Sequence, residues 1–243
     1  MSFRSFVQEL IQRFGWDVRR TAYPSSEEVL LSRFLSVARP TAVFDVGANI
    51  GQYGLSLRKC GFTGRIVSFE AIPSVHARLS AVAASDRDWI VAPCCALGRA
   101  PGELRINLAR NSVSSSLLPM HDVHVNAAPD SKYIGRETVR LERLDDVARP
   151  LLPNDAKLLL KVDTQGYEEE VLAGADFVLK SASALQLELS VAPLYQGAPS
   201  LRRILELCEG LGFRLHGLIP GFYEEKSGRL LQMDGLFLRD GAS

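Results

Sequence analysis

An acidic residue and two glycines follow a short apolar run near residue 45. In the segment Val43-Phe44-Asp45-Val46-Gly47-Ala48-Asn49-Ile50-Gly51, the acid precedes two glycines that bracket an asparagine. This order is typical of a strand, a tight turn and the start of a helix, which together present backbone N–H groups to a nucleotide-like ligand. Glycine lets the backbone approach that ligand and adopt positive φ. A glycine-rich connection without a ligand is the alternative.

The spacing of this motif indicates which ligand to expect. A dinucleotide-binding loop reads G-x-G-x-x-G, whereas this chain has G-x-x-x-G with Asp45 two residues before Gly47. An acid there suits a ligand with a cationic amino group. S-adenosylmethionine carries such a group and NAD does not, so the motif favours S-adenosylmethionine.

Two further segments could complete a nucleoside site. Glu70 ends the second apolar run, and an acid about 20 residues beyond a glycine turn typically accepts hydrogen bonds from ribose hydroxyls. A helix-capping or solvated glutamate is the alternative. The segment Cys95-Ala96-Leu97-Gly98 is small and apolar, which suits contact with an adenine ring, although such residues also fit a core.

Carboxylates at the ends of two later apolar runs could act at the reacting end of the site. Asp163 follows a nearly all-apolar run, where burial of an acid is costly unless it is used or paired. Lys161 lies on the same face of that strand, so an ion pair is the alternative. Gln186 and Glu188 end the next run in a similar way. Asp163 and Glu188 could converge as substrate-orienting carboxylates or as ligands of a divalent cation such as Mg²⁺.

Two histidines are candidates for a general base. His121 and His124 lie three residues apart within residues 109–135, a stretch without hydrophobic period. A long connection of this kind in a compact domain is usually functional or disordered, and we interpret it as a substrate lid, with disorder as the alternative. An imidazole near its ordinary pKa of about 6.5 suits proton abstraction better than an unshifted carboxylate. Asp163 remains the preferred residue at the reacting end because a strand fixes it.

Strand and helix patterns alternate from residue 40 onward and must position these residues. The alternation predicts a doubly wound α/β sheet with helices on both faces. Residues 218–236 have hairpin character and leave no room for a crossover helix, so the last strand should run antiparallel to its neighbour. The expected strands are 42–46, 65–70, 89–92, 157–162, 185–189, 213–218 and 236–239, with a short extra strand at 103–108; the expected helices are 51–60, 168–172, 201–208 and one beginning near 73.

We expect the first 39 residues to form a helical cap and residues 40–243 to form the main domain. The apolar residues between Phe3 and Phe14 recur at three- and four-residue intervals, which predicts an amphipathic helix that packs on the domain or on a second subunit in a homodimer. Docking on a membrane surface through Arg4 and Arg13 is the alternative, and Glu9 argues against it. A second helix should run from Ser25 or Ser26 to about Ala38. The charge-rich residues 136–149 are expected to form a solvated segment.

Composition narrows the class of protein. The chain has 243 residues, and its 28 Lys and Arg balance its 28 Asp and Glu. The protein therefore has no net positive charge that would attract nucleic acid. The four cysteines form no C-x-x-C pair, which favours a reducing cytosol over a disulfide framework or a zinc site. No apolar run is long enough to span a bilayer. We therefore expect a cytoplasmic protein that acts on a small molecule or carbohydrate, with no nucleic-acid partner and no membrane span.

Taken together, these motifs resemble the FkbM family of S-adenosylmethionine-dependent methyltransferases. The resemblance rests on the blocks already quoted around Asp45, Glu70 and Ala96, on Ser114-Ser115-Ser116-Leu117 and Leu144-Asp145, and above all on Leu160-Lys161-Val162-Asp163-Thr164-Gln165-Gly166-Tyr167-Glu168, with Val171-Leu172-Ala173-Gly174-Ala175 after it. It covers about residues 40–240.

The resemblance implies a class I methyltransferase fold: a Rossmann-like, seven-stranded mixed sheet with an antiparallel last strand. It also implies methylation of a hydroxyl group on a natural product or on a sugar of a bacterial glycan. The predicted catalytic residues are Asp163, Glu188, His121 and His124. The predicted cofactor-binding residues are Asp45, Gly47, Asn49, Gly51, Glu70, Ala71, Ala96 and Asp163.

Three other functions were weighed against this pattern. A nicotinamide-dependent oxidoreductase would have the first turn and the ribose acid, but it should also show G-x-G-x-x-G and a parallel last strand. A non-catalytic module could bind S-adenosylmethionine and work through a partner; the acids at Asp45 and Asp163 argue against it. A nucleic-acid methyltransferase is disfavoured because Asp163-Thr164-Gln165-Gly166 stands where base-modifying enzymes often carry an Asn/Asp-Pro-Pro-Tyr/Phe motif.

Overall fold

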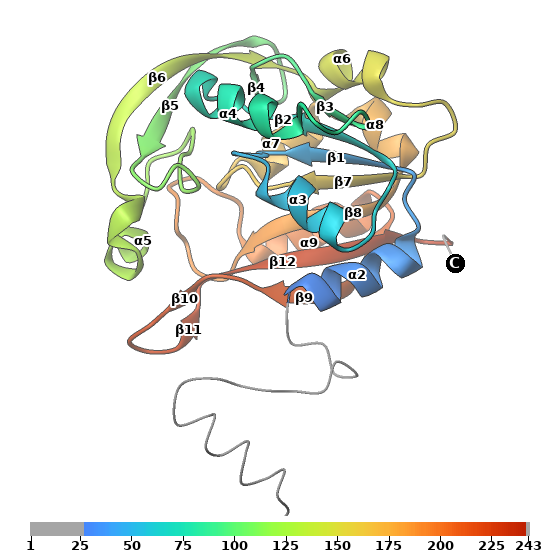
Figure 1. Cartoon of the computed structure of the whole chain (residues 1–243). Coiled ribbons are helices and arrows are strands. Elements are labelled where there is room, and N and C mark those ends of the chain that lie inside the picture. Colours follow the sequence, from blue (N-terminus) through green and yellow to red (C-terminus); the bar gives the residue numbers. More distant parts are fainter. Residues whose placement is uncertain (1–26, 242–243) are drawn as a thin grey trace, which may run out of the picture.

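A seven-stranded mixed sheet forms the centre of the protein (Figure 1). The structure is a computed structural model that describes residues 27–241. Within these residues the strand order is β3-β2-β1-β7-β8-β12-β9, and β12 runs antiparallel to both of its neighbours. The expected fold class, including the antiparallel last strand, is confirmed. The strands are β1 (Ala42–Val46), β2 (Arg65–Phe69), β3 (Trp89–Val91), β7 (Leu158–Val162), β8 (Ala182–Ser190), β9 (Phe213–Pro220) and β12 (Gln232–Arg239).

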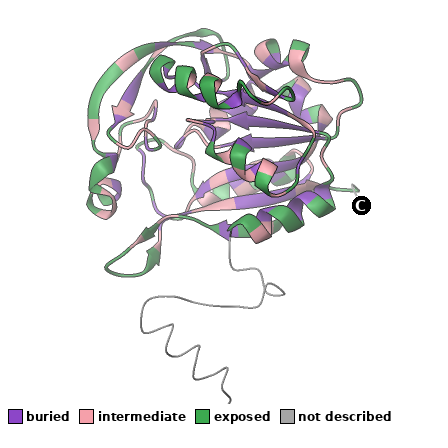
Figure 2. Ribbon diagram, in the orientation of Figure 1, coloured by how far each residue is buried: buried purple, intermediate pink, exposed green. Residues whose placement is uncertain are grey.

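Helices cover both faces of this sheet, which explains why the central strands are apolar throughout. All five residues of β1 and all five of β7 are buried (Figure 2), as expected for parallel strands between two helical layers. One layer consists of α2 (Glu27–Ala38), α3 (Gln52–Lys59) and α4 (Pro73–Ala83), and the other of α6 (Leu144–Ala148), α7 (Glu168–Ala173), α8 (Asp176–Ser181) and α9 (Leu201–Gly210).

The connection between β9 and β12 is a small hairpin, as predicted. It contains β10 (Tyr223–Glu224) and β11 (Arg229–Leu230), which pair antiparallel. Because the chain has no room for a crossover helix there, it turns back and inserts β12 between β8 and β9. This insertion places β12 residues beside the carboxyl end of β8.

The expectation of a solvated segment at residues 136–149 is wrong, because these residues contribute a strand to a second, three-stranded sheet and then form a helix. β6 (Tyr133–Glu142) lies between β4 (Ala96–Leu97) and β5 (Gly102–Ala109), and in Figure 1 β5 and β6 curve beside the main sheet. Val139 and Leu141 are buried, while Arg140 between them is exposed, as is Arg136. The alternating charges mark the outer face of a strand, and the residues that follow form α6.

The stretch 109–135 is partly helical and closely tied to the rest of the domain. It contains α5 (Asp122–Ala127) and a 3₁₀ turn at Pro129–Ser131. Asn107 pairs with Ser116 across the start of the stretch, and the Tyr133 hydroxyl donates a 2.8 Å hydrogen bond to the carbonyl of Leu118. These contacts join both ends of the stretch to the neighbouring strand and loop.

The second predicted helix is present as α2, whose Leu31 and Phe34 are buried against α3 and the sheet. The predicted amphipathic helix at Phe3–Phe14 lies outside the described residues. Among residues 27–241, no helix is both long and apolar enough to cross a membrane.

Candidate active site

The turn after β1 has a backbone that requires glycine. Gly47 has φ of 78°, and a Cβ there would lie 1.8 Å from the backbone oxygen of Asp163. The N–H groups of Gly47 and Ala48 both donate to the carbonyl of Phe69, at 3.1 and 3.0 Å. Asn49 follows with φ of 48°, a conformation that asparagine tolerates better than most residues. The turn therefore holds the carboxyl ends of β1, β2 and β7 close together.

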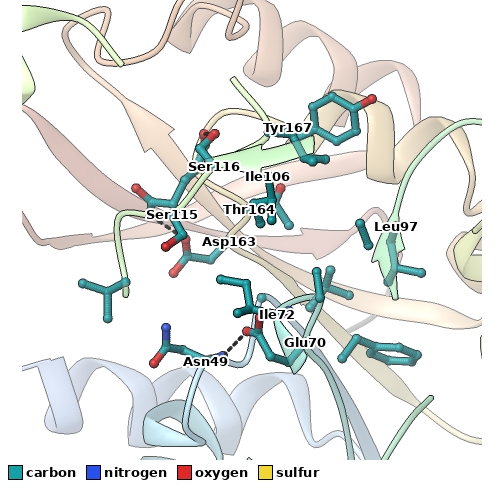
Figure 3. A pocket seen from close by; sticks show the side chains of 18 of the residues that line it. Asn49, Glu70, Ile72, Leu97, Ile106, Ser115, Ser116, Asp163, Thr164 and Tyr167 are labelled. Carbon is teal, nitrogen blue, oxygen red and sulfur yellow. Dashed lines mark hydrogen bonds between the residues drawn. The ribbon is translucent and has the colours of Figure 1, made fainter. Parts of the chain in front are cut away.

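Glu70 closes this turn from the end of β2. Its carboxylate accepts the N–H of Asn49 at 2.9 Å and the N–H of Ile72 at 2.8 Å, the first of which is drawn in Figure 3. Burial raises the pKa of Glu70, and the backbone hydrogen bonds partly offset this rise. The carboxylate is thus fixed in place, and it lines a cavity above the sheet.

The empty space of that cavity measures about 610 Å³ when the open solvent at its mouth is counted. Of the predicted cofactor-binding residues, the structure places six on its wall: Gly47, Asn49, Glu70, Ala71, Ala96 and Asp163. Figure 3 shows Glu70 and Asn49 on one side, with Leu97 and Tyr167 farther along the wall. The remaining wall is mainly apolar and includes Ile72, Leu97, Ile106 and Leu117.

Asp45 and Gly51 do not line this cavity. Asp45 is fully buried, and its Oδ1 lies 3.2 Å from Nζ of Lys161. Burial raises the pKa of Asp45, an effect that Lys161 partly offsets. A Cβ on Gly51 would approach Leu79 and Trp89 at 3.1 Å, so this glycine serves helix packing.

Lys161 also approaches Asp163, as the ion-pair interpretation anticipated, with Nζ 3.5 Å from Oδ2. Burial alone would lower the pKa of Lys161, but Asp45 and Asp163 raise it above its usual value. The lysine therefore stays charged and is shared by two carboxylates.

Asp163 and Glu188 come together through the amide of Gln165. The Gln165 Nε2 donates to Oδ1 of Asp163 at 2.8 Å and to both oxygens of Glu188 at 2.9 Å. Its Oε1 accepts the Tyr195 hydroxyl, and its backbone carbonyl accepts the Ser116 hydroxyl at 2.7 Å. These contacts hold Gln165 at φ of 56°, a strained conformation for this residue type.

This arrangement does not fit a metal site. The carboxylates of Asp163 and Glu188 face an N–H donor, whereas Mg²⁺ requires oxygen ligands. In the part of the chain that the structure describes, no group of three or more His, Cys, Asp and Glu side chains is placed to hold a metal ion. We therefore assign no step to a metal.

The structure does not bring either histidine to the cavity. His121 is exposed at the start of α5. His124 is buried between the rings of Tyr195 and Phe222, and burial lowers its pKa to about 4. Both lie on a segment whose earlier part, residues 112–117, does reach the cavity. The sequence of residues 109–135 gave no signal that separates residues 112–117, which reach the cavity, from the part that carries the two histidines.

A second cavity adjoins the first and includes Glu27, Tyr53 and Asp234, which were not predicted from the sequence as site residues. It is lined by Glu27, Tyr53, Lys161, Gln186 and Asp234, and it shares Asn49, Val113 and Asp163 with the first cavity. The sequence pattern predicts a last strand from residue 236, whereas β12 begins at Gln232 and includes Asp234. An acid between Met233 and Gly235, just before the apolar residues Leu236, Phe237 and Leu238, was the available signal.

Sequence comparison identifies the family. Residues 45–215 match the methyltransferase FkbM domain, which is more than half of the chain. The chain belongs to the FkbM methyltransferase family. The match begins at Asp45 and includes the turn, Glu70, Asp163 and Glu188; Asp234 lies beyond its end.

Individual relatives of this FkbM protein are distant. It is 31% identical over 155 residues to methyltransferase sdnD from Sordaria araneosa, an alignment that covers 55% of this chain and 60% of that protein. Precorrin-6y C5,15-methyltransferase from Geobacter metallireducens is 14% identical with a TM-score of 0.46, covering 91% of this chain and 92% of that one. WbdD is 17% identical with a TM-score of 0.45, covering 87% and 39%.

Proposed function

We propose that this FkbM protein is an S-adenosylmethionine-dependent O-methyltransferase that acts on a hydroxyl group of a small molecule or sugar. The observation that carries the proposal is the meeting of two cavities at Asp163. Methyl transfer needs one site for the donor and one for the acceptor, with a common boundary where the two reacting atoms align.

The first cavity fits the donor. Glu70 offers carboxylate oxygens to a ribose diol, and the apolar wall formed by Ala96, Leu97 and Ile106 suits an adenine ring. Asp163 places negative charge at the other end, where it suits the cationic sulfonium. When bound, S-adenosylmethionine supplies a methyl group that is already a strong electrophile. The chain's own residues then have to orient the two ligands, exclude water and accept a proton.

Asp163 is well placed for orientation. Lys161 and Gln165 each hold one of its oxygens, so the carboxylate cannot rotate freely. Gln165 in turn is held by Tyr195 and Ser116. A fixed charge at the boundary of the two cavities can stabilise the sulfonium and align the methyl group with the acceptor oxygen.

Residues 112–117 support the proposed lid. They contribute Ser112, Val113, Ser115, Ser116 and Leu117 to the wall of the first cavity. Ser112 contacts Asn49 across the mouth at 3.3 Å, and Val113 is 49% exposed although it lines both cavities. We propose that this part of the segment 109–135 opens for ligand entry and closes to exclude water during transfer.

Calorimetric titration of the purified protein tests the donor assignment. We expect micromolar binding of S-adenosylmethionine and S-adenosylhomocysteine and no comparable binding of NADH. The variant Ala71→Trp should abolish binding because the indole fills the first cavity, while Ala71→Ser should retain it. Preferential NADH binding, or unaltered binding by Ala71→Trp, would overturn the assignment. Incubation with tritiated S-adenosylmethionine and a panel of sugars and alcohols then separates an enzyme, which transfers label, from a module that only binds.

A further inference from the structure

The register of the main sheet gathers polar side chains on the face covered by α2 and α3. Asp45 pairs with Lys161 across β1 and β7, and Lys161 pairs with Gln186 across β7 and β8. Two residues farther along β8, Glu188 pairs with Asp234 on β12. Because side chains alternate between faces along a strand, these residues and Asp163 share one face. They lie at the floor of the second cavity and beside it.

Most of the residues that line the second cavity have polar side chains, and the cavity adjoins the point proposed for methyl transfer. It measures about 660 Å³ including its mouth. Side chains from α2, α3, β7, β8 and β12 line it, and it meets the first cavity at Asn49, Val113 and Asp163. An occupant of this groove would therefore contact the end of the first cavity at which Asp163 lies.

The carboxylates near this boundary differ in which oxygens are free. Asp163 has one oxygen beside Lys161 and the other bonded to Gln165. Both oxygens of Glu188 accept the Gln165 amide. Asp234 differs because only its Oδ2 is held, by Gln186 Nε2 at 3.1 Å. Among the described residues, its Oδ1 has no hydrogen-bond donor.

A chain of hydrogen bonds fixes the orientation of Asp234. The Tyr53 hydroxyl donates to Oε1 of Gln186 at 2.7 Å, which directs the amide nitrogen of Gln186 toward Oδ2 of Asp234. Tyr53 and Gln186 thus act as positioning residues. They leave Oδ1 of Asp234 available to a ligand in the groove.

The surroundings of Asp234 tune its acidity. Burial and the negative charge of Asp163 raise the pKa of Asp234 to about 7, with Lys161 opposing the rise. A carboxylate with a pKa near the working pH is suited to general-base catalysis. The titratable groups that face it or lie beside it are Glu27 on α2, Tyr53 on α3, Asp45 on β1, Lys161 and Asp163 at the end of β7, and Glu188 on β8.

We propose that this groove is the acceptor subsite and that Oδ1 of Asp234 takes the proton from the hydroxyl that is methylated. The acceptor oxygen forms a bond to the methyl carbon, its proton passes to Asp234, and the electron pair of the broken methyl–sulfur bond stays on sulfur. Among the described residues that line the groove, the carboxylates of Glu27, Asp163 and Asp234 outnumber the one cation, Lys161, which disfavours a phosphorylated acceptor. The acceptor class is therefore a neutral polyol or sugar hydroxyl. This inference rests on the proposed function.

The test measures the ionisation of Asp234 directly, so it does not require the natural acceptor. Carboxyl carbons of ¹³C-aspartate-labelled protein are titrated by NMR, and the Asp234 signal is assigned by its loss in Asp234→Asn. We expect titration near pH 7 in the free protein. Because Asp234 would face the sulfonium across the groove, S-adenosylmethionine should lower this midpoint, whereas the neutral thioether of S-adenosylhomocysteine should shift it much less.

The outcomes separate this inference from the proposed function. Titration of Asp234 near pH 4, or equal shifts with both ligands, would overturn the general-base assignment even if calorimetry shows that both ligands bind. Absence of S-adenosylmethionine binding would instead overturn the proposed function, and the inference with it.

A kinetic comparison completes the test once the panel yields an acceptor. Asp234→Asn should lower kcat by at least 100-fold, the scale of general-base catalysis, and abolish the rise of the rate through pH 7, with unchanged affinity for S-adenosylhomocysteine. Asp240→Asn is the matched control, because Asp240 follows the same strand, is exposed and pairs only with Arg214 among the described residues. A phosphorylated sugar preferred over its neutral parent would contradict the acceptor class.

Discussion

Replacement of Asp234 with asparagine should stabilise the folded protein at alkaline pH, although it removes the proposed base. The pKa of Asp234 is raised from 3.8 to about 7, chiefly by burial. Between these two values the folded state binds more protons at this site than the unfolded state, so stability falls as pH rises. Below pH 4 the carboxyl group is protonated in both states and contributes no difference. Above pH 7 the full cost of ionising it in the fold is present.

The magnitude follows from the pKa difference. A shift of about three pKa units corresponds to about 4 kcal/mol of unfolding free energy. Asp234 is partly accessible at the wall of the groove, and solvent screening lowers such a cost, so we expect about 2 kcal/mol. The asparagine side chain retains an oxygen that can accept the Gln186 hydrogen bond. For a domain of this size, 2 kcal/mol corresponds to a rise in Tm of roughly 4–8 °C.

The assay is thermal unfolding of the wild-type protein and Asp234→Asn at a series of pH values from 4 to 8.5. The difference in Tm between the two proteins, and not either Tm alone, reports the effect of Asp234, because Glu70 and Glu168 also have raised pKa values and titrate in both. The charge of Asp234 contributes to the raised pKa of Glu188, so the loss of that charge acts in the same stabilising direction. We expect the difference to be near zero at pH 4 and to grow through pH 7. A difference that stays constant with pH, or a variant less stable than wild type at pH 8, would refute the reasoning.

Three further predictions concern the turn and the two cavities. Gly47→Ala should reduce the unfolding free energy, measured by urea denaturation, by more than about 3 kcal/mol because the added Cβ meets backbone atoms. Gly61 has φ of 84° and open space around it, so Gly61→Ala should reduce the unfolding free energy by only about 1–2 kcal/mol. Asp163→Asn should weaken S-adenosylmethionine binding about tenfold and S-adenosylhomocysteine binding much less, as measured by calorimetry, because only the former carries a sulfonium charge. Tyr53→Phe should reduce stability by about 1 kcal/mol and lower kcat severalfold without changing cofactor affinity, because Gln186 loses its buried partner.

Each of these predictions has a clear contrary result. Equal losses for the two glycine variants would mean that the turn after β1 can move away from β7. An equal effect of Asp163→Asn on both adenosyl ligands would place the carboxylate away from the sulfur. A Tyr53→Phe variant with unchanged kcat would show that Gln186 needs no such support.

Much of the fold could be predicted from the sequence because its signals are local. The apolar run Ala42–Val46, Pro73 at the first turn of α4 and the apolar strand ending at Val162 set strand and helix positions within a few residues. The short connection after β9 predicted an antiparallel last strand, because two neighbouring strands joined by a short hairpin run in opposite directions and parallel strands need a longer crossover. The strand β6 was missed because its charged outer face obscured the buried Val139 and Leu141.

The residues that line the first cavity were predictable for a related reason. Gly47 and Asn49 belong to one turn, and Glu70 directly follows the strand to which that turn is hydrogen-bonded. The motif of strand, turn, helix and next strand therefore predicts that these three residues lie together. Asp45 was predicted to lie among them, but the alternation of side chains along β1 turns it to the face where Lys161 lies. His121 and His124 were equally plausible from composition, and packing of α5 against Tyr195 and Phe222 directs them elsewhere.

The sequence by itself determined that strands and helices alternate, and that glycine and acid meet at the first turn, because these properties depend on residues close together in the chain. The tertiary structure alone decided which distant residues share an environment. Tyr53, Gln186 and Asp234 form one hydrogen-bonded chain although 181 residues separate its ends. That meeting depends on the register of β8 with β12 and on the burial that raises the pKa of Asp234. Neither property is encoded in any short segment, because sheet register and burial arise only when the whole domain packs.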